Sequence, residues 1–350
     1  MSNRTKITVA VTGINNIDSP GPGIPVIRAL RDSQYFDVRI IGLSYESLEP
    51  GIYLRELVDK SYSIPFPSAG IASLIERLRY INDREGIDVL IPNFDAELYN
   101  FIKIEKRLKQ EFGIATFLPT IEQFESRHKA VLNEFGERNG INVPPSRVIH
   151  THSEIKEFGK EYGFPLVVKG KYYEANIAKS YDQAVVYFNK ISSKWGLPII
   201  VQQFIPGDEV NVTAIGDGKG CCIGAIPMRK MYITDKGKAW AGITLEDNTL
   251  LSIAISIIEK THWRGGCELE FIKTKDGKYY LLEMNPRFPA WVYLAVGCGQ
   301  NHPEALVRMS LGEELVPFVI YDSRKMFVRY SYDQIVSLSE FEKVSISGEL

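Results

Sequence analysis

Short apolar runs rich in β-branched residues alternate with helix-like patterns over residues 1–118. The runs end in Gly, Pro or a polar loop, as strands do; they are ITVAVT (7–12), FDVRIIGL (36–43), IDVLIP (87–92) and IATFLP (114–119). Between the second and third runs, apolar residues recur at helical spacing: Ile71, Leu74, Ile75, Leu78 and Ile81. Strand–helix alternation predicts a doubly wound α/β domain, with a mainly parallel sheet and helices on both faces.

The pattern changes after residue 119. A helix is predicted over 120–139, because Thr120 and Gln123 form a capping-box pattern and Gly140 follows the last turn. Further helices are predicted at 153–162, 181–194 and 246–262, and a strand at 165–169. From residue 199 the chain is rich in strands, with turn signals at Pro206-Gly207, Asp217-Gly218 and Asp276-Gly277. This part is expected to be an α+β region with antiparallel hairpins.

Composition narrows the classes of partner. The 350 residues are 45% hydrophobic and allow two or three domains. Lys and Arg number 41 against 43 Asp and Glu, so no net basic field indicates nucleic acid. No apolar stretch approaches the ~18 residues of a membrane span, and the first residues lack the architecture of a signal peptide. The four cysteines show no CxxC spacing, which favours reduced thiols and a cytoplasmic protein.

The most informative segment is the predicted hairpin CELEFIKTKDGKYYLLEMNPRF, residues 267–288. If Asp276-Gly277 forms a two-residue turn, Glu270 faces Glu283 and Glu268 faces Asn285. These four side chains then share one face, while the other face carries Leu269, Phe271, Leu282 and Met284. Like charges directly opposite each other are destabilising, so this face favours a bound cation.

The ligands offered on this face are all oxygens, which suits Mg²⁺ or Mn²⁺ rather than zinc. Pro286 ends the strand, and Arg287 follows at once, where it can meet an anion beside the metal. The alternative is an ordinary solvated acidic face, which surface hairpins often have.

At the predicted sheet's carboxyl edge, Asp95 and Glu97 follow a strand and are candidate substrate contacts.

The sequence Glu-Xaa-Asn-Pro-Arg after a hairpin resembles the magnesium-binding end of ATP-grasp enzymes. The resemblance is to the synthetase domains of carbamoyl phosphate synthetase large subunits and to related carboxylate–amine ligases, and it covers about residues 120–312. It implies an ATP-grasp fold behind an N-terminal Rossmann-like domain. The implied division is a pre-ATP-grasp domain (1–118), a small subdomain with a linker helix (119–198), a large subdomain with the metal site (199–317) and a C-terminal strand extension (318–350).

The resemblance also implies roles for single residues. Glu270, Glu283 and Asn285 match the metal ligands, and Arg287 matches the arginine that contacts the transferred phosphate or acyl phosphate. The ATP-binding residues implied by the resemblance, or placed on its phosphate flap, are Lys129, Lys169 and Lys171 at the phosphates, Gln203, Phe204 and Ile205 at the adenine, and Glu209 at the ribose.

One segment departs from the family pattern. A glycine-rich flap is expected after Lys169, but this chain has only Gly170 before Tyr181. Side chains stand where glycines are expected, among them Lys171, Tyr172, Tyr173, Asn176 and Lys179. Side-chain donors could replace some backbone donors, but the flap must close differently.

The implied function is an ATP-dependent ligase that uses two Mg²⁺ ions. A carboxylate or peptide substrate would be phosphorylated to an acyl phosphate, with Lys169 and Arg287 as catalytic groups, and then attacked by an amine or thiol. Arg229 is a further candidate substrate contact. A homodimer is compatible with the general prevalence of twofold assemblies.

Three alternatives stay open. One is phosphorylation of bicarbonate or carbamate together with a partner protein, as in carbamoyl phosphate synthesis. Another is a nucleotide-binding regulatory module without catalysis, which the glycine-poor flap motivates. An NAD-dependent oxidoreductase has only the generic sheet in its favour.

Overall fold

The computed structural model describes residues 4–16, 20–171, 174–234 and 237–350. The chain forms two compact units, which we describe separately. Unit 1 comprises Met1–Phe124, Asn211–Glu268 and Asn285–Leu350, and unit 2 comprises Glu125–Val210 and Leu269–Met284. The division of the chain into four parts made from the sequence stays a prediction.

Unit 1 begins with a four-stranded parallel sheet. Its strands are β1 (Thr5–Val11), β2 (Phe36–Ser44), β3 (Lys60–Ser63) and β4 (Val89–Ile91), in the order β3-β2-β1-β4. All three neighbouring pairs are parallel, with Val9 opposite Ile40 on one side and Val11 opposite Ile91 on the other. The predicted parallel sheet is confirmed, while its classification as Rossmann-like stays a prediction.

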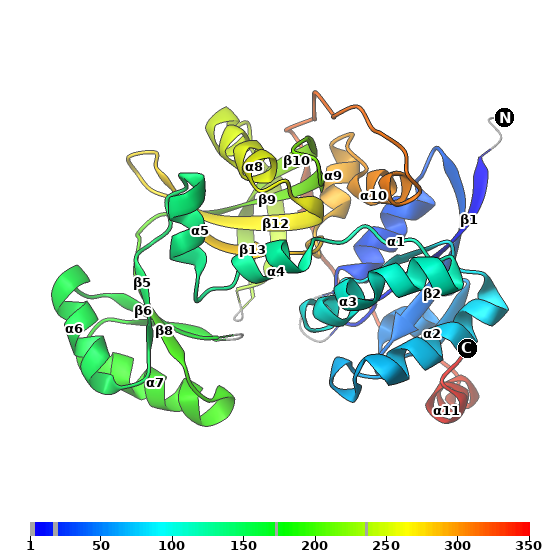
Figure 1. Ribbon diagram of the computed structural model, residues 1–350, viewed down its shortest axis with the longest axis horizontal. Coiled ribbons are helices and arrows are strands. Elements are labelled where there is room, and N and C mark those ends of the chain that lie inside the picture. Colours follow the sequence, from blue (N-terminus) through cyan, green and yellow to red (C-terminus); the bar gives the residue numbers. More distant parts are fainter. Residues whose placement is uncertain (1–3, 17–19, 172–173, 235–236) are drawn as a thin grey trace. The chain divides into compact units, whose positions relative to one another are not determined.

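Helices cover both faces of this sheet. They are α1 (Gly23–Arg31), α2 (Ile71–Glu85) and α3 (Asp95–Phe112), with short 3₁₀ turns η1 (Pro50–Tyr53) and η2 (Pro67–Ala69). Val9 and Ile27 of α1 belong to one buried cluster, whereas Ala10, Leu78 of α2 and Phe101 of α3 belong to another. Alternate residues of β1 therefore pack against α1 on one face and against α2 and α3 on the other (Figure 1).

The predicted strand at 114–119 is wrong. Only Ala115 forms a bridge, to Val89, and β3 is a strand that the sequence analysis missed. The segment turns away because the Leu118 carbonyl accepts a hydrogen bond from Arg264 Nη1 at 2.6 Å instead of a neighbouring strand's N–H. Short edge segments of this kind are fixed by their neighbours rather than by their own pattern.

The chain also forms a six-stranded sheet. Its strands are β9 (Asp208–Asp217), β10 (Cys222–Ile233), β11 (Ala239–Thr244), β12 (Arg264–Lys273), β13 (Tyr279–Asn285) and β14 (Met326–Val328), in the order β13-β12-β9-β10-β11-β14. The helices of this part of the chain are α8 (Asn248–Lys260), α9 (Tyr293–Gly297), α10 (His302–Ser310) and α11 (Leu338–Ser347).

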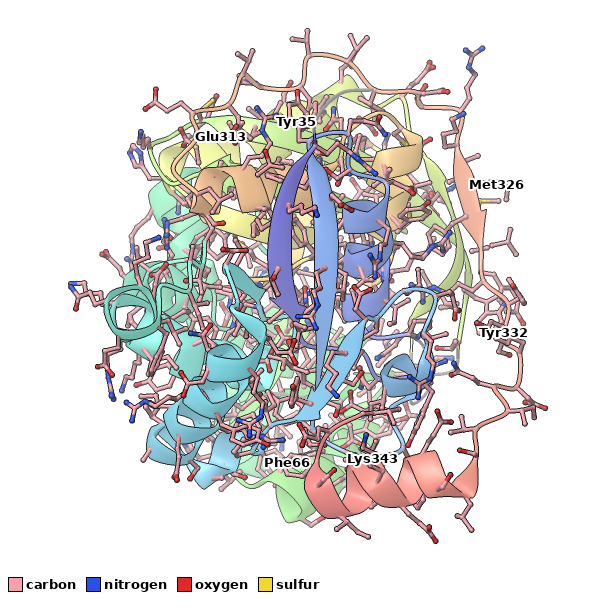
Figure 2. All side chains as sticks on the ribbon, turned by 90° about the vertical axis from the view of Figure 1, so that its right-hand side faces the viewer. Tyr35, Phe66, Glu313, Met326, Tyr332 and Lys343 are labelled. Carbon is pink, nitrogen blue, oxygen red and sulfur yellow. The ribbon has the colours of Figure 1, made fainter. Side chains whose placement is uncertain are left out.

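The C-terminal segment is mostly extended. Figure 2 shows it running past Met326 and Tyr332 to the helix that carries Lys343. Its only strand within the described residues, β14, pairs with β11, and Gly242 faces Phe327. At its end Leu350 exchanges two backbone hydrogen bonds with Ser61 of β3, both 3.0 Å long. Among the described residues, no helix combines the length and apolar character that crossing a membrane requires.

Unit 2 is built on an antiparallel sheet of β5 (Ser146–Ile149), β8 (Ile199–Gln203), β6 (Leu166–Gly170) and β7 (Ala175–Ala178), in that order. Figure 1 shows α6 (His152–Tyr162) and α7 (Tyr181–Trp195) together on one face of this sheet. Phe158 and Phe188 from these helices share a buried cluster with Val168 and Val201 of the strands. Lys169 and Gln202, the next residues along, therefore project from the opposite face.

The single helix predicted over 120–139 is wrong. The chain instead forms α4 (Ile121–Ser126) and α5 (Leu132–Asn139), and the predicted capping pair at Thr120 and Gln123 does form at the start of α4. Lys129 lies in the turn between the two helices rather than on a helix. The passage from unit 1 to unit 2 lies between Phe124 and Glu125, inside α4 and just before this break.

The hairpin of β12 and β13 closes differently from the prediction. Thr274 N donates to Lys278 O at 2.9 Å, and Gly277 N donates to Thr274 O at 3.0 Å. Gly277 has φ +79°, so the connection is a three-residue loop with a left-handed glycine. The pairing of the two strands near the turn is displaced by one residue. Accordingly Leu281 is fully buried, whereas Leu282, which we expected in the core, is half-buried.

Candidate functional site

The polar face of unit 2 holds two groups in direct contact. Lys169 Nζ on β6 donates a hydrogen bond of 2.7 Å to Gln202 Oε1 on β8. Burial and the charge of Lys129 lower the pKa of Lys169 to about 8, against the opposing effect of Glu283 and Glu270. An ammonium surrounded by one cation and two carboxylates is typical of a site that binds a charged group.

Lys129 links this face to the hairpin. Its Nζ lies 3.3 Å from Glu283 Oε1, and the two side chains are 21% and 32% exposed. Unit 2 thus brings together four predicted site residues: Lys129, Lys169, Glu270 and Glu283. The displaced register near the turn does not prevent both carboxylates from acting on Lys169.

Four further residues predicted to bind nucleotide lie at the end of β8 and in the segment that follows it. Gln203 ends the strand, and its backbone N donates to Pro145 O at 2.8 Å. Phe204 and Ile205 lie half-buried in the link to β9, and Glu209 lies half-buried in β9 itself. Their contact with adenine and ribose stays a prediction.

The segment predicted as a flap is a β-hairpin where it is described. β6 and β7 pair antiparallel from Leu166 opposite Ala178 to Lys169 opposite Ala175. Lys171 is exposed just after β6, and its charge contributes to the lowered pKa of His128, after burial and Arg127. Tyr172 and Tyr173 lie outside the described residues.

Unit 1 contains a separate cluster around Arg287. Arg287 Nε donates to Asp95 Oδ2 at 3.0 Å, and its Nη1 donates to the Phe288 carbonyl at 3.2 Å. The arginine side chain is 17% exposed. Asp95 is the first residue of α3, so the sheet edge of unit 1 supplies the carboxylate. The arginine predicted at the phosphate and the aspartate predicted at the substrate are therefore joined directly.

Glu268, expected on the acidic metal-binding face, has a different role. It is buried and accepts hydrogen bonds from Asn211 Nδ2 at 3.0 Å, Trp291 Nε1 at 2.7 Å and Asn285 Nδ2 at 3.3 Å. Its second oxygen also lies 3.7 Å from Arg287 Nη1. Because both carboxylate oxygens have such partners, Glu268 holds the end of the hairpin in unit 1.

Glu97, grouped with Asp95 as a candidate substrate contact, is also structural. It is 1% exposed and accepts hydrogen bonds from Thr12 and Tyr45 side chains and from the backbone N of Asn93 and Phe94. Burial raises its pKa to about 7 against these four donors. Glu97 therefore fixes the start of α3 rather than facing a ligand.

Two further predicted residues, Asn285 and Arg229, lie on strands β13 and β10. Asn285 ends β13, is 7% exposed, and lies two residues from Glu283 on the same strand, so both project from one face. Arg229 is exposed on β10 and donates to the Met231 sulfur at 3.7 Å; no contact among the described residues joins it to Asp95 or Arg287. Within the described part of the chain, no three His, Cys, Asp or Glu side chains form a metal cluster, and the predicted set contains only two carboxylates and an amide.

The sequence analysis missed Gln202 and Asn93. Gln202 alternates with buried Val201, a signal that could have placed it on the same face as Lys169. Asn93 gave no signal beyond its place after a strand, because its importance depends on contacts with Thr12, far away in the sequence.

Residues 197–331 match the family described as "ATP-grasp in the biosynthetic pathway with Ter operon". The carbamoyl phosphate synthase large chain of Clostridium beijerinckii is 26% identical over 284 residues, which cover 74% of this chain and 25% of that protein. Its counterpart in Clostridium botulinum strain Alaska E43 is 25% identical over 342 residues, 90% of this chain and 30% of that one. The predicted resemblance to ATP-grasp proteins is therefore confirmed, and the family model matches it over residues 197–331.

Solved structures agree with this fold. Biotin carboxylase from Campylobacter jejuni aligns with a TM-score of 0.71 at 17% identity, covering 92% of this chain and 74% of that one. N5-carboxyaminoimidazole ribonucleotide synthetase from Thermotoga maritima aligns with a TM-score of 0.60 at 18% identity, covering 90% and 78%. The biotin carboxylase domain of Hydrogenobacter thermophilus 2-oxoglutarate carboxylase, solved as a dimer with MgADP and bicarbonate, gives a TM-score of 0.66 at 19% identity over 89% and 70%.

The chain spans about a quarter of the length of the curated relatives that it matches. Its own substrates belong to the proposal that follows.

Proposed function

We propose that this protein is an ATP-grasp ligase that uses ATP and Mg²⁺ to convert a carboxylate to an acyl phosphate. A carboxylate oxygen would form a bond to the γ-phosphorus while the bond from that phosphorus to ADP breaks. An amine, or a thiol, would then attack the acyl carbon and release inorganic phosphate. No nucleophile from the protein is needed for either step.

The observation that carries the proposal is the Lys169 ammonium beside Lys129, Glu270 and Glu283 in unit 2. Lys129 and Lys169 would bind the phosphates of ATP. Their mutual repulsion, which helps to lower the pKa of Lys169, is relieved when an anion lies between them. The proximity of the two ammonium groups therefore favours the binding of a polyanion between them.

The donor set suits Mg²⁺. Glu270, Glu283 and Asn285 would hold the ion, which prefers oxygen ligands and neutralises charge on the β- and γ-phosphates when bound. Glu283 Oε1 lies 3.3 Å from Lys129 Nζ, so one proposed metal ligand is held beside a lysine proposed to bind the phosphates. The number of ions, two by analogy with the family, belongs to this proposal.

Arg287 would stabilise the transferred phosphate and the acyl phosphate. Its guanidinium is held by Asp95 and by the Phe288 carbonyl, which restricts its rotation before a ligand arrives. A positioned, permanently charged donor loses little conformational entropy when an oxyanion forms beside it.

The test is phosphate release from MgATP across a matrix of carboxylates and amines. We expect Glu283→Gln to lower the rate by at least about a hundredfold, because a metal ligand and its charge are lost together. Glu137→Gln, an exposed glutamate of α5 in the same unit, is the matched control and should keep the wild-type rate.

Retention of the full rate in Glu283→Gln would contradict the assignment of the metal site. Binding of ATP without phosphate release for any pair in the matrix would instead favour the regulatory module.

The carbamoyl phosphate synthase relatives favour a second candidate, phosphorylation of bicarbonate or carbamate with a partner protein. In this reaction the smallest carboxylate takes the place of an organic one, and the same residues serve it. Formation of carbamoyl phosphate from bicarbonate, ammonia and MgATP by the protein would support this candidate over the first.

A further inference from the structure

The parallel sheet of unit 1 has one position where its connections change direction. From β1 the chain passes to β2 and β3 on one side, and then returns to β4 on the other side of β1. The carboxyl ends of β1 and β4 therefore diverge into Thr12-Gly13 and Pro92-Asn93. In open α/β sheets this is the place where ligands bind.

Asn93 presents an unused acceptor at this position. It is 1% exposed, and its Nδ2 donates to the carbonyls of Thr12 at 3.2 Å and Ile91 at 3.0 Å. These two bonds fix the orientation of the amide, because a flipped amide would set its oxygen against two carbonyls. Its Oδ1 is buried and has no hydrogen-bond partner within the described residues. A buried acceptor of this kind is costly unless a donor arrives.

Asp95 presents a second unused acceptor on the same loop. Its Oδ2 accepts from Arg287 Nε, whereas its Oδ1 is buried and has no partner in the described part of the chain. Asn93 and Arg287 line one small hollow of unit 1 together with Pro92, Phe117, Gly266 and Phe288. Asp95 does not line the hollow itself but contacts Arg287, which does, so the two unused acceptor oxygens belong to residues in and beside the hollow.

The charges around the hollow favour a ligand with both signs of charge. Arg287 already contacts two carboxylates, Asp95 and the more distant Glu268, so a plain carboxylate would meet an arginine that is largely neutralised. An ammonium group on the same ligand would compensate Asp95 and donate to the unused oxygens. The spacing is short, because Asp95 and Arg287 are in direct contact.

We propose that this hollow binds the carboxylate substrate and selects an α-amino acid. The ammonium would donate to Asp95 Oδ1 and Asn93 Oδ1, while the adjacent carboxylate would lie at Arg287. Asp95 and Asn93 are then specificity residues. The inference rests on the proposed function for the fate of the carboxylate, but the binding of the amino acid is a separate property of unit 1.

The test uses three molecules of the same skeleton: alanine, lactate and propionate, which differ only in carrying –NH₃⁺, –OH or –H. Matched triads built on larger side chains, those of phenylalanine and glutamate, extend the panel. Each is titrated calorimetrically into the protein without nucleotide. In at least one triad we expect the amino acid to bind roughly tenfold or more tightly than its des-amino analogue, as a charge-assisted hydrogen bond implies.

Asp95→Asn should reduce this preference to within about threefold, because the charge that selects the ammonium is lost. The readout is a ratio of two affinities, which a partly misfolded sample does not change. Asp83→Asn, an exposed aspartate of α2, is the control and should keep the wild-type ratio.

Equal affinities within every triad, or an unchanged ratio in Asp95→Asn, would overturn the inference. Phosphate release with MgATP is measured in parallel. Release with des-amino acids as fast as with amino acids overturns the inference and leaves the ligase proposal standing. Selective amino acid binding without any phosphate release supports the inference while the ligase proposal fails.

Discussion

Lys169 is the residue whose electrostatics bear most directly on nucleotide binding. Its pKa of about 8 means that the ammonium loses its proton in a range where ordinary lysines keep theirs. Bound phosphates would raise this pKa again, because they stabilise the charged form. Affinity for MgATP should therefore be constant below about pH 8 and fall above it, by up to about tenfold per pH unit.

Calorimetric titration of MgATP from about pH 7 to about pH 10 measures this directly. Lys169→Arg is the matched variant, since a guanidinium stays charged throughout the range and should flatten the profile. A wild-type affinity that does not change above pH 8 would contradict the lowered pKa.

Single residues were also where the sequence was most and least informative. The order Lys129, Lys169, Glu270, Glu283 was sufficient to predict a group that the structure does bring together. The role of Glu268 was not accessible, because its partner Trp291 lies beyond the hairpin and Asn211 lies far before it. Alternation along a strand predicts a face, but it does not say which other elements reach that face.

At the scale of elements, the hairpin that carries Glu270 and Glu283 depends on one glycine. Gly277 has φ +79°, where a Cβ meets no atom within 4 Å but the backbone conformation itself is unfavourable for alanine. Gly277→Ala should lower the free energy of unfolding by about 1 kcal/mol. Gly277→Asn should cost less, since asparagine adopts the left-handed region more readily.

Chemical denaturation of both variants measures the difference. Because the turn lies at the exposed tip of the hairpin, phosphate release should stay near the wild-type rate in both. A loss of activity larger than the loss of stability would mean that the substitution shifts the register along the whole hairpin.

Elements with strong periodicity were predicted well, and elements defined by long-range contacts were not. The period in Leu74, Leu78 and Ile81 predicted α2, and all three are buried. The segment between α4 and α5 contains no Pro or Gly, so the sequence does not predict the break between the two helices. The ion pair that Lys129 of this segment makes with Glu283 joins positions far apart in the sequence. The asymmetry is physical: local propensity sets long helices, whereas tertiary contacts decide turns and short strands.

At the scale of the whole molecule, residues that are close in the sequence do not always belong to the same compact unit. Three segments of the chain build unit 1, and the β12–β13 hairpin passes from unit 1 into unit 2 and back. As a result Glu283 and Asn285, two residues apart, fall in different units. Composition and motif spacing give no access to this division, because it is set by which surfaces pack together and not by position along the chain.

This division leads to a prediction about heat denaturation. Most of the side chains proposed to bind MgATP, among them Lys129, Lys169 and Glu283, lie in unit 2, whereas Asn285 and Arg287 belong to unit 1. The nucleotide should therefore stabilise unit 2 more than unit 1. At a ligand concentration of about a hundred times Kd the stabilisation is about 2.7 kcal/mol, enough to raise the transition of a small unit by several degrees. Scanning calorimetry should show one transition moving upward with MgATP further than the other. EDTA, or Glu283→Gln with the metal present, should remove most of the shift. A shift of equal size in both transitions, or one that survives EDTA, would mean that the nucleotide is held by groups other than those on the polar face of unit 2.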